Sequence, residues 1–104
     1  MMSESAVFLV GTPIGNLDDL SPRAIETLGV VDIVYAEDTR RTVGLFRRFA
    51  ITTPLRSLHE HNEAARAQEI LERLRSGQNC ALVTDAGAPA VSDPGARLVR
   101  AVTE

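Results

Sequence analysis

The sequence predicts an α/β fold in which a parallel sheet forms the middle of three layers. Short apolar runs alternate with stretches of helical periodicity four times within 104 residues, and this alternation is typical of strand–helix units. The first of these runs, residues 6–10, is apolar on both faces, as a strand buried in a parallel sheet should be. The connections are short, so right-handed crossovers would keep the strands parallel. We therefore expect one domain over residues 1–104.

The first part of the chain predicts two strands and the helix between them. Residues 6–10 form an apolar, β-branched run that predicts a buried strand. Ser21 followed by Pro22 predicts the start of a helix, and Gly29 predicts its end. Residues 30–36 then predict the second strand.

A second helix is predicted over residues 37–49, with apolar and basic side chains on opposite sides. The apolar side would hold Val43, Phe46, Phe49 and Ala50, and the opposite side Arg40, Arg41, Gly44, Arg47 and Arg48. The simplest interpretation places the arginines in solvent, but such a face would also suit the phosphates of RNA.

The second half of the chain continues the same alternation. Residues 55–58 predict a short strand, and Asn62 predicts the cap of the next helix. That helix would run to Gly77 on apolar residues at helical spacing, namely Ala67, Ile70, Leu71 and Leu74. Residues 80–83 predict the fourth strand, and residues 96–102 predict a last helix.

Composition narrows the class of protein. The chain is 44% apolar and 24% charged, as expected for a soluble domain, and its net charge of −3 gives no general attraction for nucleic acid. Cys80 has no second cysteine to pair with, which favours a reducing compartment. No segment resembles a signal peptide or has the length of a membrane span. We expect a cytoplasmic protein.

The densest turn chemistry lies between the fourth strand and the last helix. Residues 84–95 contain two glycines, two prolines and two aspartates, more than a simple connection needs. Ligands of α/β folds bind at the carboxyl ends of the strands, so this segment predicts a ligand-binding loop. A rigid connection, with Ser92 or Asp93 capping the helix, is the alternative.

Two further segments follow predicted strands and would share that edge of the sheet. Residues 11–16 match neither a P-loop nor a dinucleotide fingerprint, and a tight turn alone would explain them. Glu37 and Asp38 would favour a helix N-terminus through the dipole. In a cleft, Arg40 beside them would instead orient a phosphate or a carboxylate.

Both histidines, His59 and His61, follow the third predicted strand. Their spacing permits metal ligation, but no third ligand completes a set, so we expect no metal. A helix cap with exposed polar neighbours is one interpretation, and a place beside the substrate is the other. No Ser-His-Asp order can be assigned.

Taken together, the four segments resemble the N-terminal domain of the ribosomal RNA small-subunit methyltransferase I family, in the tetrapyrrole (corrin/porphyrin) methylase superfamily. The matching segments, in the family's order and spacing, are residues 10–17, 36–40, 58–63 and 85–95. Thr84 stands where Ser is expected, and Ala88 stands where Thr is common, so a hydroxyl contact is lost there. Family members carry a second α/β domain that this sequence lacks. We therefore expect the N-terminal half of the fold, truncated after Glu104.

The resemblance implies a homodimeric enzyme that uses S-adenosylmethionine to methylate the 2′-hydroxyl of a cytidine in small-subunit (16S) ribosomal RNA. It implies cofactor contacts from Asp85, Ala86, Gly87, Ala88, Pro89 and Ser92, with Asp85 able to hold the ammonium group. It implies a substrate-facing loop containing Gly11, Thr12, Pro13, Gly15 and Asn16. The catalytic candidates are Glu37, Asp38, Arg40, His59 and His61, with the base unassigned. Two alternatives stay open: a tetrapyrrole C-methyltransferase of the same superfamily, and a module that is folded and dimerising but inactive as an isolated fragment.

Overall fold

The computed structural model describes residues 5–12 and 20–85. Its elements follow the predicted order: β1 (Val7–Thr12), α1 (Pro22–Val30), β2 (Ile33–Ala36), α2 (Thr39–Arg48), β3 (Leu55–Ser57), α3 (Glu63–Arg75) and β4 (Cys80–Asp85). The helix predicted at residues 96–102 lies outside the described residues.

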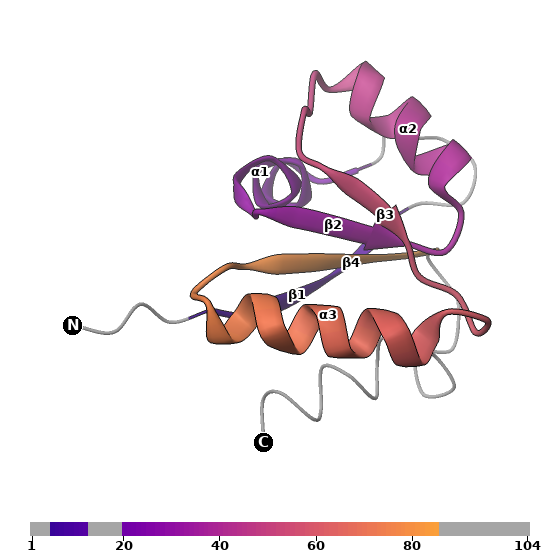
Figure 1. The fold of residues 1–104 in the computed structure, drawn as a ribbon. Coiled ribbons are helices and arrows are strands. Elements are labelled where there is room, and N and C mark those ends of the chain that lie inside the picture. The colour runs from indigo at the N-terminus through magenta and orange to yellow at the C-terminus, as the bar shows by residue number, and fades with distance from the viewer. Residues whose placement is uncertain (1–4, 13–19, 86–104) are drawn as a thin grey trace.

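The four strands form one sheet in the order β1-β4-β2-β3, and every neighbouring pair is parallel. Helices α1 and α2 lie over one face of this sheet and α3 lies over the other (Figure 1). Alternate strand residues supply the two cores: Val34 and Ala36 pack on the α1/α2 side, whereas Ile33 and Tyr35 pack on the α3 side. The predicted three-layer α/β fold is confirmed.

The prediction that the first strand is buried on both faces is wrong. β1 pairs with β4 alone among the described strands, which places it at an edge of the described sheet. Phe8 is 43% exposed and Leu9 is 46% exposed, while Val7 and Val10 are buried. An apolar run shows which residues favour a strand, but it does not reveal the strand's position in the sheet.

Two helix predictions also needed correction. Gly29 does not end α1, which continues through Val30, so β2 begins at Ile33 rather than at residue 30. On α2, Val43 is exposed, and the buried side is formed by Thr42, Leu45 and Phe46. Thr42 can be buried because its hydroxyl donates to the Asp38 carbonyl oxygen at 3.1 Å.

Helix α2 ends in a tight reversal at Ala50, whose φ of 55° is unusual for a residue with a Cβ. The Ile51 N–H closes this reversal on the Phe46 carbonyl oxygen at 2.9 Å. We expect Ala50→Gly to raise the free energy of unfolding by roughly 0.5 kcal/mol, because glycine adopts this conformation without steric cost. Urea denaturation measures the change. The matched variant Gly77→Ala, at φ 88°, should lower stability, and a loss of stability in Ala50→Gly would contradict the argument.

Candidate functional site at the carboxyl edge of the sheet

The ends of β1 and β4 lie side by side. Thr12 is in register with Asp85, and Gly11 with Thr84. The buried Thr12 hydroxyl donates to the Thr84 carbonyl oxygen at 3.1 Å, which ties the two ends together. The chain therefore leaves both strands at neighbouring positions. Gly11 and Thr12, predicted as part of a loop, belong to the strand itself.

The ends of β2 and β3 complete the same edge. Ala36 is in register with Val83 on one side and with Ser57 on the other. Beyond the last paired residue, the Leu58 N–H donates to the Ala36 carbonyl oxygen at 2.9 Å. The segments that begin at Glu37 and at Leu58 thus start beside each other. All four predicted segments follow strands that end at one edge.

Asp38 serves as the N-cap of α2. Its Oδ1 accepts from the backbone N–H groups of Arg40 at 3.1 Å and Arg41 at 3.3 Å. The prediction that Asp38 lies at a helix N-terminus is therefore confirmed, and its carboxylate is held by the start of its own helix. Glu37, immediately before the cap, has an exposed side chain, and so does Arg40.

Replacing Asp38 by alanine should destabilise the fold, whereas replacing it by the isosteric asparagine should not. We expect Asp38→Ala to lower the free energy of unfolding by about 1 kcal/mol, because two backbone donors lose their acceptor. Asp38→Asn should retain most of the stability, since asparagine caps as well as aspartate does. Thermal denaturation of both variants checks this. Equal losses in the two variants would show that the charge, rather than the capping oxygen, matters.

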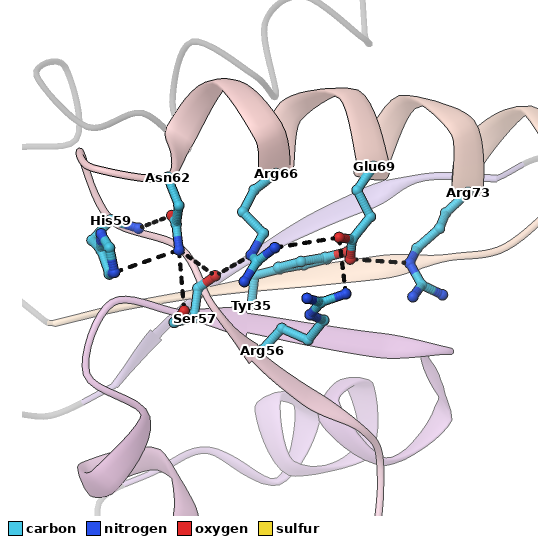
Figure 2. Close-up of polar contacts among 8 residues, drawn as sticks. All are labelled: Tyr35, Arg56, Ser57, His59, Asn62, Arg66, Glu69 and Arg73. Carbon is cyan, nitrogen blue, oxygen red and sulfur yellow. Dashed lines mark hydrogen bonds and ion pairs between the residues drawn. The ribbon is translucent and has the colours of Figure 1, made fainter.

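The loop after β3 is held by Asn62 rather than by a helix cap. Asn62 occupies the N-cap position of α3 but makes no capping hydrogen bond with its side chain, contrary to our prediction. Instead, its Oδ1 accepts from the His59 N–H at 2.8 Å and its Nδ2 donates to the Ser57 hydroxyl at 3.1 Å (Figure 2). This clamp draws residues 57–62 into a closed turn.

The two histidines lie together in that turn. The His61 N–H donates to Nδ1 of His59 at 3.3 Å, and the two rings meet edge to face with centroids 5.7 Å apart. His59 is half-buried and His61 is exposed. Among the described residues, no three His, Cys, Asp or Glu side chains are grouped as metal ligands would be.

A polar network that the sequence did not predict continues from this loop along α3. Glu69 accepts from the hydroxyl of the fully buried Tyr35, and from Nη1 of Arg56 at 3.0 Å. Arg66 and Arg73 each approach its carboxylate to 3.5 Å (Figure 2). Burial alone would raise the pKa of Glu69, but the Tyr35 hydrogen bond and the three guanidinium groups lower it overall. Tyr35 and Glu69 are 34 positions apart, so no local pattern signals their contact.

Two buried acidic groups, the thiol of Cys80 and the phenol of Tyr35, should make the fold sensitive to alkali. Burial raises the pKa of Cys80 from 9.0 to about 11, and burial with the neighbouring Glu69 raises that of Tyr35. Between the pKa in the unfolded chain and the pKa in the folded chain, each group retains in the folded state a proton that it has lost in the unfolded state. Stability should therefore be complete below about pH 9 and fall as pH rises through 11. Urea denaturation across this range tests it, and Cys80→Ala should flatten the slope. An unchanged slope in that variant would contradict the assignment.

Comparison with known proteins identifies the family to which this sequence and fold belong. The sequence pattern of the family described as Tetrapyrrole (Corrin/Porphyrin) Methylases matches residues 6–104. The chain belongs to this family. A solved structure of a cobalamin synthesis related protein (CobF) from Corynebacterium diphtheriae has the same fold, with a TM-score of 0.66 at 18% identity. That match covers 95% of this chain and 47% of the other.

Curated relatives of this tetrapyrrole methylase chain include proteins named "Ribosomal RNA small subunit methyltransferase I". The relative from Synechocystis is 57% identical over 94% of this chain and 35% of its own length. Those from Pseudomonas aeruginosa and Bacillus subtilis are 52% and 53% identical, over 95% and 94% of this chain. The chain spans about a third of the length of these relatives.

The structure of this family member places only some of the predicted site residues. Glu37, Asp38, Arg40, His59 and His61 all follow the ends of β2 and β3 at the carboxyl edge. The backbone of Asp85 closes β4 at the same edge. The other residues predicted to contact cofactor or substrate lie outside the described residues: Pro13, Gly15, Asn16, Ala86, Gly87, Ala88, Pro89 and Ser92. None of the described helices has the length and apolar character needed to cross a bilayer.

Proposed function

We propose that residues 1–104 are the N-terminal domain of a cytoplasmic, homodimeric methyltransferase that uses S-adenosylmethionine to methylate small-subunit ribosomal RNA. We further propose that the acceptor is the 2′-hydroxyl of a cytidine. The observation that carries this proposal is the convergence of the four predicted segments on the carboxyl edge of the sheet, where α/β folds bind ligands. The names of the curated relatives supply the class of reaction and of acceptor.

The residues at this edge fit such a reaction. S-adenosylmethionine carries a methyl on a positively charged sulfur, and its transfer needs alignment with the acceptor oxygen more than strong acid–base catalysis. The segment from Asp85 to Pro89, with Ser92, would hold the methionine end of the cofactor. Glu37, His59 or His61 would take the hydroxyl proton late in the step. Asp38 is less suited to that role because its carboxylate already caps α2.

Helix α2 begins at this edge of the sheet and carries exposed arginines that RNA could contact. Arg40 lies in its first turn, and Arg47 and Arg48 lie in its last. All three side chains are exposed, although the chain as a whole carries a net charge of −3. Such a local patch would contact phosphates and make binding depend on salt. A solvated helix face remains the alternative.

The description of the family as Tetrapyrrole (Corrin/Porphyrin) Methylases makes methylation of a tetrapyrrole the second candidate. Full-length protein is supplied with labelled S-adenosylmethionine and, in parallel, with unmodified small ribosomal subunits or a porphyrinogen-type substrate. We expect label in the RNA alone. Label in the tetrapyrrole alone would replace the first proposal with the second, and label in neither would contradict both.

A further inference from the structure

The cluster around Glu69 carries more positive charge than its own fold requires. Three guanidinium groups, from Arg56, Arg66 and Arg73, surround one carboxylate, so two positive charges are left over. The phenol of Tyr35 adds no charge, because burial and its contact with Glu69 favour the neutral form. This surplus stands out on a chain whose net charge is −3.

Hydrogen-bond donors in the cluster also outnumber their acceptors. Each guanidinium has five N–H donors, whereas the acceptors are the Glu69 carboxylate, which also accepts from Tyr35, the Ser57 carbonyl oxygen for Arg66 and Oε1 of Gln78 for Arg73. The side chains of Arg56, Arg66 and Arg73 are 44%, 19% and 30% exposed, so a ligand could reach some of these donors, although not the buried Nε of Arg73. Donors in such excess are suited to a ligand rich in anionic oxygens.

The cluster is continuous with the candidate site. Arg66 donates from Nε to the Ser57 carbonyl oxygen at 2.7 Å, and Ser57 is clamped by Asn62 in the loop that holds His59. Figure 2 shows this sequence of contacts running from the loop along α3. Arg56 projects from β3, the edge strand of the described sheet on that side, and its side chain is 44% exposed.

We propose that Arg56, Arg66 and Arg73 form a phosphate-binding surface for the RNA substrate, extending from the carboxyl edge along β3 and α3. This surface is separate from the arginines of α2, and it deepens the proposed function by placing the flanking nucleotides. RNA that delivers one nucleotide to the edge would continue past the Ser57–Asn62 loop onto these guanidinium groups. Glu69 would hold the arginines in place, while its negative charge would lower the net attraction between this surface and RNA phosphates.

Two substitutions, one that removes a positive charge and one that removes a negative charge, test this surface in the full-length protein. Affinity for a small-subunit ribosomal RNA fragment is measured by filter binding over a series of salt concentrations. Arg56→Gln should weaken binding about three- to tenfold and reduce the slope of log affinity against log salt by about 0.7. Glu69→Gln should strengthen binding about threefold, because it removes a negative charge while its amide oxygen still accepts from Tyr35. Arg23→Gln, at an exposed position on α1, is the matched control and should change neither quantity.

A network that only stabilises the fold predicts a different pattern. Glu69→Gln would then lower the melting temperature without strengthening RNA binding, and Arg56→Gln would leave the salt dependence unchanged; that pair of results would overturn the proposal. If Glu69→Gln does not fold, the exposed Arg56→Gln and Arg56→Glu variants decide the question by their salt slopes. Binding of S-adenosylmethionine and methyl transfer are measured alongside. If the full-length protein transfers the methyl but the substitutions do not change RNA affinity, the proposed surface alone is refuted. If the substitutions change RNA affinity but the protein transfers no methyl, the proposed reaction alone is refuted.

Discussion

Replacing the proton acceptor at the carboxyl edge is expected to reduce kcat for methyl transfer by about 100-fold or more, since a positioned general base typically contributes that much. The acceptor should be among Glu37, His59 and His61, whose segments follow the adjacent ends of β2 and β3. The variants Glu37→Gln, His59→Gln and His61→Gln remove the acceptor while retaining similar size. Single-turnover assays of the full-length protein on unmodified small subunits measure the loss.

Asp38→Asn provides the control for this set. It changes a carboxylate at the same edge but retains the cap of α2, so kcat should fall less than about threefold. Binding of S-adenosylmethionine, followed by calorimetry, should be unchanged in every variant that lowers kcat alone. If none of the three replacements lowers kcat tenfold, the proton is taken by another group and our assignment of the acceptor is wrong.

Leu28→Ala is expected to cost about 2–5 kcal/mol of the free energy of unfolding, the range for truncating a fully buried leucine. Leu28 has no exposed surface and packs α1 against the α1/α2 face of the sheet with Val34, Ala36 and Leu45. A loss of this size is a large part of the stability of an ordinary domain, so we expect the protein to unfold near physiological temperature. Urea denaturation monitored by circular dichroism measures it.

Val30→Ala is the matched variant on the same helix. Val30 is 72% exposed, so removing two methyl groups there should change stability by less than about 0.5 kcal/mol. Similar losses in the two variants would mean that α1 does not pack as described. A small loss at both positions would contradict the assignment of Leu28 to the core.

The sequence alone was sufficient to predict the sheet class and every described helix, because both depend on local patterns. Apolar runs marked β2 and β4, and Ser21, Asp38 and Gly77 lie at the helix ends that their chemistry favours. The position of β1 at an edge of the described sheet could not be predicted, since strand order depends on how crossovers pack and not on the run itself. The buried side of α2 was predicted wrongly because Thr42, a polar residue, is buried there with its hydroxyl hydrogen-bonded to a backbone oxygen.

The candidate site, too, could be predicted only in part from the sequence. Its location was predictable, since parallel strands end at one edge and the turn residues follow directly after them. The role of Asn62 was not: at a helix start its side chain can cap the helix or bond back to the loop, and only the fold decides between these. The Tyr35–Glu69 contact joins a strand to a helix 34 residues away, and nothing local to either residue indicates it.

The central claim, that this edge serves methyl transfer to the ribose of small-subunit ribosomal RNA, is tested most directly by identifying the product. Full-length protein is incubated with S-adenosylmethionine carrying a labelled methyl and with unmodified small subunits, and the RNA is digested to nucleosides for mass spectrometry. We predict label in 2′-O-methylcytidine from one position. Label on a base, or no label in the RNA, would contradict the claim.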